Sequence, residues 1–233
     1  MRTPFTLLVM LSFGVSAALS ARGVDDARLK DAELVLTEMA GSFDTGIPRS
    51  LLAKARCVVI IPGVKKAALG VGGQYGRGYI SCRLDGLSSS TAADPVVASR
   101  WSAPGGIRIE GGSVGLQIGG AETDVILLVM NQRGVDRLLT NNFKVGADAA
   151  VAAGPVGREA TAQTDITMRA EMLAWSRSRG VFAGLSIQGS TLRDDSGENK
   201  ELYGREIDNR EIVTGKVPAP KPTHNLLKVL SKF

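Results

Sequence analysis

One serine lies in a pattern that hydrolases use for nucleophilic catalysis. Residues 111–115 match the G-x-S-x-G nucleophile elbow, with Ser113 as the nucleophile. The elbow needs a strand before the serine, a helix after it and a histidine base. A strand pattern follows Ser113 instead, and the only histidine, His224, lies in a proline-rich segment near the chain end. We therefore expect no hydrolase activity from this motif.

Other catalytic and cofactor-binding patterns are also incomplete. One histidine and two cysteines 25 positions apart cannot build an ordinary zinc site. The glycine-rich residues 70–75 fail the dinucleotide-binding pattern at its last position. Two carboxylates meeting in space are the one enzymatic arrangement left open, although Asp124 and Asp148 are expected to cap turns or form ion pairs. The sequence predicts a protein that is not an enzyme and has neither cofactor nor metal.

Cys57 and Cys82 allow two interpretations. In an oxidising compartment they would form one disulfide, which closes a loop of about 26 residues and contributes about 3.5 kcal/mol in the chain-entropy model. Alternatively, each cysteine is a small buried hydrophobic residue on its own strand. The sequence favours neither interpretation over the other.

Basic residues concentrate in one stretch of the chain. Residues 45–84 hold seven basic residues and no acid, whereas residues 85–215 hold 13 basic and 17 acidic residues. An acid-free stretch of this length indicates a cationic surface. Its members are Arg49, Lys54, Arg56, Lys65, Lys66, Arg77 and Arg83.

A cationic surface fits several anionic partners. Each Lys or Arg near an anionic membrane contributes roughly 1 kcal/mol. We expect no nucleic acid, because an exported protein seldom meets it and the aromatic residues of a single-strand binder are sparse. An acidic protein partner and a face that only aids solubility are the alternatives. The expected partner is an anionic phospholipid or membrane surface, contacted through Arg49, Lys54, Arg56, Lys65, Lys66 and Arg77.

The beginning of the chain resembles a secretory signal. Arg2 precedes a short apolar run at residues 7–15, and small residues follow, with cleavage expected after Ser20. An uncleaved anchor or a buried helix is the alternative. The absence of a cysteine at the cleavage site argues against a lipoprotein. We expect an exported protein of the periplasm or cell envelope, with residues 1–20 as signal peptide, 21–215 as the domain and 216–233 as a proline-rich basic tail.

The hydrophobic pattern predicts an α+β fold with N-terminal helices, a β-dominated antiparallel or barrel-like sheet and a short C-terminal helix. Apolar residues spaced three and four apart predict a helix over residues 24–40, and a second helix begins at Pro48. β-branched and glycine-rich runs then predict a series of strands. The expected strands are 57–61, 70–84 (a pair of strands or one long bent strand), 107–109, 113–118, 124–130, 148–152, 171–175 and 181–187, with further helices at 134–140 and 206–213.

Several ordered blocks resemble the SYLF-domain family. They begin with IPRSLLAKARCVVIIPGVKKA and GVGGQYGRG, continue through GGSVGLQIGGAETDVILLVMN and GADAAVAAGPVGR, and reach WSRSRGVFAGLSIQGS. The resemblance covers residues 47–213 and implies lipid binding, with actin binding in the yeast members. Family members that contact lipid through a basic N-terminal helix differ from this chain, whose residues 24–40 are acidic. We therefore assign the lipid contact to residues 45–84 instead.

Overall fold

The computed structural model describes residues 16–41, 46–84, 100–140, 142–156, 170–178, 181–183, 187 and 189–233. The predicted signal peptide lies outside these ranges up to residue 15, and the expected cleavage site at Ser20 falls within helix α1. The helices of the described chain are α1 (Ser16–Gly41), α2 (Arg49–Lys54), α3 (Gln132–Leu138), α5 (Ser196–Tyr203), α6 (Asn209–Val213), the 3-10 turn η2 (Lys221–Thr223) and α7 (His224–Leu230).

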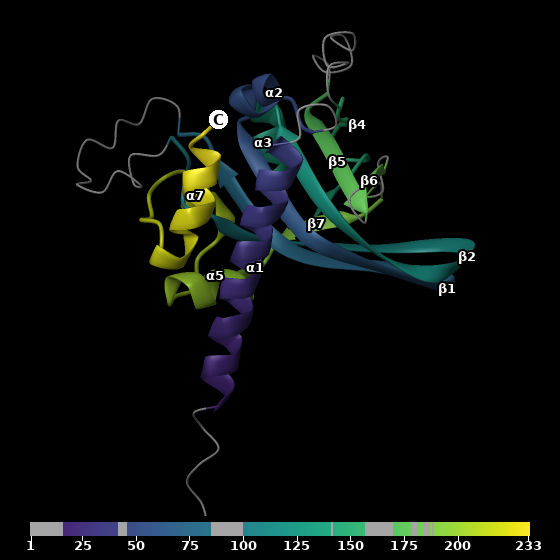
Figure 1. Ribbon diagram of the computed structural model, residues 1–233, viewed down its shortest axis with the longest axis horizontal. Helices are drawn as coiled ribbons and strands as arrows, with labels where there is room; N and C mark the ends of the chain where they lie inside the picture. Colours follow the sequence, from purple (N-terminus) through teal and green to yellow (C-terminus); the bar gives the residue numbers. More distant parts are fainter. Residues whose placement is uncertain are drawn as a thin grey trace, which may run out of the picture.

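The described strands form one seven-stranded sheet that is antiparallel except for the β4–β5 pair. The predicted α+β class with a mainly antiparallel sheet is therefore confirmed, and Figure 1 shows the sheet curling beside α1. The strands are β1 (Cys57–Cys82), β2 (Gly105–Val129), β3 (Phe143–Lys144), β4 (Val151–Ala153), β5 (Met172–Ser178), β6 (Val181–Ala183) and β7 (Thr191–Asp194).

Strand β1 doubles back on itself. A straight strand of its 26 residues would span about 85 Å, yet the Cα atoms of its first and last residues, Cys57 and Cys82, lie 3.9 Å apart. Strand β2 pairs with β1 from one end to the other, so it makes the same turn. Together the two strands form a ribbon whose middle projects from the domain, at the right of Figure 1. We call this projection, residues 62–76 and 110–123, the β-arm.

The turn of the β-arm is visible in the strand register. Leu69 pairs with Ile118 and Val71 pairs with Val114, so β1 advances two residues while β2 advances four. The longer path places β2 on the outside of the bend. The glycines and the proline of these segments predict several separate strands, because both residues commonly mark strand ends. That division was wrong, since each series forms one continuous strand.

A β-bulge carries β1 past Pro62 and Gly63. The register shifts between Ile61 and Val64, so the missing N–H of Pro62 breaks no ladder bond and Gly63 adopts a positive φ of 54°. Proline is tolerated in a strand at such a position because no partner needs its hydrogen. The predicted strand end at this pair was therefore wrong.

The first segment of β1, residues 57–61, is buried on both faces of the sheet. Val58 and Ile60 belong to the core cluster shared with α1, α2 and α7, while Val59 and Ile61 belong to the cluster on the opposite face. Alternation along β1 sends successive side chains to opposite faces, which explains why this run is apolar throughout. The predicted inward stripe of the first helix is confirmed: Leu29, Ala32, Val35, Leu36 and Met39 are all buried.

The end of the chain packs into the domain. Prolines and lysines predict a basic tail over residues 216–233, whereas the structure has η2 followed by α7. The apolar side of α7, formed by Leu226, Leu227, Val229 and Leu230, is buried in the cluster that contains α1. Four buried apolar residues in one short helix explain the difference, because their burial outweighs the breaking effect of the preceding prolines.

We predict that Gly78→Ala destabilises the fold by about 3 kcal/mol, the upper end of overpacking costs. A Cβ at Gly78 would lie 2.0 Å from the carbonyl oxygen of Ile60 on the opposite limb of β1. Gly73→Ala is the matched control on the same strand, because its nearest neighbour would be 3.9 Å away. Urea unfolding of both variants measures the difference, and equal midpoints would contradict the close contact between the limbs.

Candidate functional site

The serine motif lies in a setting unsuited to a nucleophile elbow. Ser113 is an internal residue of strand β2, opposite Gly72, and strand continues on both sides of it. The helix that the motif requires is therefore missing from its place. His224 begins α7, where its Nε2 lies 3.4 Å from the carbonyl oxygen of Ala219. Within the described ranges, no group of three His, Cys, Asp or Glu residues is arranged to hold a metal ion.

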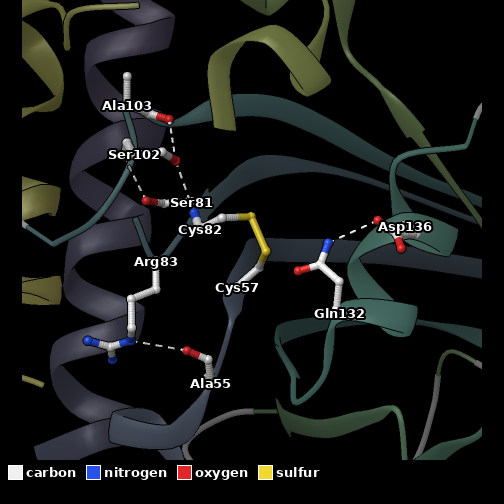
Figure 2. The surroundings of a disulfide bond; sticks show 9 residues. All are labelled: Ala55, Cys57, Ser81, Cys82, Arg83, Ser102, Ala103, Gln132 and Asp136. Atoms are coloured by element: carbon white, nitrogen blue, oxygen red, sulfur yellow. Dashed lines mark hydrogen bonds between the residues drawn. A yellow bond between two sulfur atoms is a disulfide. The ribbon is translucent and has the colours of Figure 1, made fainter. Parts of the chain in front are cut away.

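Cys57 and Cys82 form a disulfide that joins the two ends of β1, as Figure 2 shows. Both cysteines are buried, at 0% and 5% exposure. Beside the bond, the backbone N–H of Cys82 donates to Oγ of Ser102 at 3.0 Å, and the hydroxyl of Ser81 donates to the carbonyl of Ser102 at 2.8 Å. The disulfide and these hydrogen bonds hold the return limb of β1 in place.

The basic residue that follows the disulfide has a structural role. The guanidinium of Arg83 donates to the carbonyls of Leu52 at 3.2 Å and Ala55 at 3.3 Å, where α2 ends. Its Cζ also lies 4.4 Å from the centre of the Trp101 ring. A cation at a helix C-terminus satisfies carbonyls that the helix leaves unpaired. Arg83 therefore fixes α2 against the strand pair.

Three of the predicted lipid contacts lie together at the start of the sheet. Arg49 and Lys54 are exposed residues of α2, and Arg56 is exposed just before β1. Arg49 and Lys54 form no ion pair with any other described residue. In Figure 1 this group lies near the top of the view, at the α2 end of the domain.

Lys65 and Lys66 lie farther along β1, at the base of the β-arm. As consecutive strand residues they point to opposite faces of the ribbon. Lys65 is exposed and stands opposite Glu122 in the register, whereas Lys66 is only half-exposed and stands opposite Ala121. Burial lowers the pKa of the Lys66 amine. The two lysines therefore differ in how much charge they present to a surface.

Arg77 differs from the other predicted contacts. Its Nε donates to Asp195, and its Nη2 lies 3.3 Å from Oε2 of Glu198. The hydrogen bond and the charge of Asp195 raise the pKa of Arg77 against the opposing effect of burial. Both acids are almost fully buried, so the guanidinium of Arg77 forms its ion pairs inside the protein. Its side chain is 27% exposed, so we expect it to contribute less to a cationic surface than the exposed cations.

The acids that hold Arg77 belong to a buried polar cluster on helix α5. Glu198, only 1% exposed, accepts from the hydroxyl of Tyr79 and from Arg28 of α1. Burial, together with the charge of Glu198, raises the pKa of Tyr79 and keeps this phenol protonated. We call Arg28, Arg77, Tyr79, Asp195 and Glu198 the α5 cluster. It connects α1, β1 and α5 through charged hydrogen bonds.

Helix α5 is attached to the sheet by polar contacts. Asp195 caps its first turn by accepting from the backbone N–H of Glu198 at 3.3 Å, and Gly204 ends it with a positive φ of 69°. Asn199 accepts from the backbone N–H of Gly106 in β2 at 2.6 Å. Helix α5 was not predicted from the hydrophobic pattern. Its signals in the sequence are Asp195, three residues before Glu198, and the terminal Gly204.

The structure and its relatives define the class of protein. No helix in the described part of the chain has the length and hydropathy to span a bilayer. A family model described as "Ysc84: Las17-binding protein actin regulator" matches residues 110–233. The molecule is therefore a curled α+β domain, and the matching family is described by the proteins that its members bind or regulate. The chain belongs to this Ysc84 family, whose domain is the SYLF domain that the sequence motifs predicted.

Three relatives illustrate the similarity. The chain is 31% identical over 192 residues to SH3 domain-containing YSC84-like protein 1 of Rattus norvegicus, covering 82% of this chain and 52% of the relative. It is 32% identical over 188 residues to SH3 domain-containing protein PJ696.02 of Schizosaccharomyces pombe, covering 79% and 41%. It is 31% identical over 191 residues to Protein YSC84 of Saccharomyces cerevisiae, covering 80% and 38%. The chain thus spans about half the length of these relatives or less.

We predict that replacing both Cys57 and Cys82 by Ala lowers the free energy of unfolding by about 3.5 kcal/mol, because the open loop gains conformational entropy. Urea unfolding of the oxidised protein and of the double variant measures the loss. Alkylation followed by mass measurement, with and without reductant, is the control that confirms the bond in the parent protein. Equal stability of the two forms would contradict the assigned role.

We predict that Arg77→Gln destabilises the protein by about 3 kcal/mol at neutral pH, because it leaves the buried Asp195 without its ion-pair partner and Glu198 with Arg28 alone. Lys200→Gln is the control, since Lys200 pairs with Glu206 on the surface, where both are more than half exposed. Such a pair contributes less than about 1 kcal/mol. Thermal or urea unfolding compares the two variants, and an equally small loss in both would contradict a structural role for Arg77.

The same variant has an expected pH dependence. Burial raises the pKa of Asp195, but the hydrogen bond and charge of Arg77 outweigh it, so the folded pKa is lowered. A carboxylate of this kind contributes stability above its unfolded pKa of about 3.9 and loses it as the pH falls through the folded value. The stability difference between the parent and Arg77→Gln should therefore shrink below about pH 4. A difference that stays constant down to pH 2 would contradict this linkage.

Proposed function

We propose that this chain is an exported, non-enzymatic protein of the periplasm or cell envelope that binds anionic phospholipid through a basic surface. Export rests on the signal-like residues 1–20, and lipid binding rests on the resemblance to SYLF-domain proteins together with the acid-free residues 45–84. The names of the curated relatives refer to an SH3 domain and to YSC84, and the family description refers to Las17 and actin. A chain sent across a membrane would meet neither of those cytoplasmic partners.

The accessibility of the cations is the observation that best supports this proposal. Arg49, Lys54 and Lys65 are exposed and form no ion pair with another described residue. Arg56 adds charge next to α2, and Lys66 adds charge next to Lys65. Arg77 pairs with Asp195, and Arg83 donates to the backbone carbonyl of Leu52. The four exposed cations, at roughly 1 kcal/mol each, would give reversible attachment to an anionic surface. Lys66 is half-exposed and points to the opposite face of the ribbon from Lys65, so it would add less. The lipid contact we propose therefore comprises Arg49, Lys54, Arg56, Lys65 and Lys66.

Helix α1 has a different role in this proposal. Its apolar stripe is buried against β1 and α7, so this side is not available to lie in a membrane. Its solvent side carries exposed acids such as Asp26 and Asp31. A helix that lies in an anionic membrane surface presents Lys and Arg on its polar face instead. The charges therefore favour attachment through α2 and the base of the β-arm.

We predict that the mature protein floats with vesicles containing phosphatidylglycerol and not with vesicles of phosphatidylcholine alone. Arg49→Glu/Lys54→Glu and Lys65→Glu/Lys66→Glu should each weaken binding at least about thirty-fold, since each removes two attractive charges of roughly 1 kcal/mol. The matched control is Lys144→Glu/Lys200→Glu, which makes the same change in net charge at exposed positions outside residues 45–84.

Two results would overturn the proposal. Equal recovery with both vesicle types would show that charge does not direct the attachment. An equal loss in the control variant would show that net charge, and not this surface, is responsible. Absence of flotation, with retention of the protein by an immobilised acidic protein, would favour an envelope interaction module instead.

A further inference from the structure

An open groove lies between helix α1 and the base of the β-arm. Its volume is about 640 Å³, within the usual range of ligand sites. Ala27, Asp31, Leu34 and Glu38 line its helical wall at spacings of three and four residues, so they form one face of α1. The opposite wall comes from β1 and β2. The β-arm leaves the domain beside α1 (Figure 1), and the groove is open to solvent.

Two exposed apolar side chains line this groove, one from each wall. Leu34 is 48% exposed and Tyr75 is 49% exposed, and they are the large hydrophobic residues that stand out as exposed in the described chain. Leu34 belongs to α1 and Tyr75 to β1, yet both line the same groove. Exposed apolar residues gathered in a concave site mark a surface that another molecule covers.

Most charges in the groove are already paired. Arg28 and Arg77 are held by the buried acids of the α5 cluster. Glu38 and Asp124 are both held by Arg177, at 2.7 and 2.9 Å. These pairs leave little net charge for a ligand to recognise.

Three charges remain in the groove. Asp31 and Glu122 form no ion pair with another described residue, and they come from opposite walls. Glu122 lies against the β1 backbone, because a Cβ added to Gly63 would be 2.6 Å from its Oε1. Lys65 is the single cation left, so the residual charge of the groove is negative. An anionic headgroup is disfavoured there, while a cationic group is favoured.

We propose that this groove binds a short cationic, amphipathic peptide segment of a partner protein. An apolar side chain of the segment lies between Leu34 and Tyr75, and Lys or Arg side chains on either side of it contact Asp31 and Glu122. The two acids stand on opposite walls, so a ligand that engages both must present two cations around an apolar group. A peptide supplies this arrangement with neighbouring side chains. The groove shares Lys65 with the proposed lipid contact, but the peptide proposal does not depend on lipid binding.

The test uses the full mature chain and three sets of short fluorescein-labelled peptides. Each peptide has a central Leu, flanked by Lys and Arg, by Ser, or by Glu and Asp. Fluorescence anisotropy at low salt should show the cationic set binding at least about tenfold more tightly than the neutral set, which is the preference expected of two exposed charge pairs. The acidic set should not bind. Equal binding of the cationic and acidic sets, or no binding of the cationic set, would overturn the proposal.

Variants then separate the two parts of the groove. Leu34→Ser and Tyr75→Ser should each weaken binding of the cationic and neutral sets, whereas Asp31→Asn/Glu122→Gln should remove the preference for the cationic set. Lys65→Gln is the matched control, and it should leave that preference unchanged or stronger. An unchanged preference in Asp31→Asn/Glu122→Gln would overturn the assignment of the acids. Because these residues are exposed, circular dichroism should confirm folding in each variant.

The two proposals can fail separately. Asp31→Asn/Glu122→Gln should still float with phosphatidylglycerol vesicles, because it leaves the proposed lipid-binding cations in place. If the parent protein binds the cationic peptides without floating, only the lipid proposal is lost. If it floats and binds no peptide, only the groove proposal is lost.

Discussion

The close contact between the two limbs of strand β1 is the constraint on which the rest of the structure depends. Gly78 lies so near the backbone of Ile60 that no side chain fits between them, and the Cys57–Cys82 disulfide joins the limbs at their ends. Because β2 pairs with β1 along its whole length, it must follow the same path. The β-arm, the groove beside α1 and the placement of Lys65 and Lys66 all follow from this double turn.

The charges of the domain fall into two groups with different tasks. Arg28, Arg77 and Arg83 satisfy acids or carbonyls inside the fold, so their removal is expected to affect stability more than binding. Arg49, Lys54 and Lys65 have no such partners in the described structure and remain available to a ligand. Sequence position alone does not separate the groups, because members of both lie in the same acid-free stretch. Pairing with a buried carboxylate or with backbone carbonyls is what distinguishes them.

Local patterns predicted much of this fold. The apolar stripe of α1 was predicted correctly because helical spacing reports directly which side is buried. The expected strands overlap β1, β2, β4, β5 and β6, but the short strands β3 and β7 were not predicted. The division of β1 and β2 into several strands was wrong, since glycine and proline within a strand can mark a bend or a bulge as well as an end. Helix α5 was missed because Glu198 and Asn199, which it buries, are polar. A hydrophobic pattern carries no sign of a helix held by hydrogen bonds.

The sequence by itself determined the family, the α+β class and the concentration of cations in residues 45–84. These properties depend on residue types and their order, and both are given directly by the sequence. Only the tertiary structure decided that Cys57 meets Cys82, that Arg77 is held by α5, and that Leu34 and Tyr75 share one groove. Each of these depends on bringing together residues at least 25 positions apart, and that approach is set by the folded path of the whole β-ribbon.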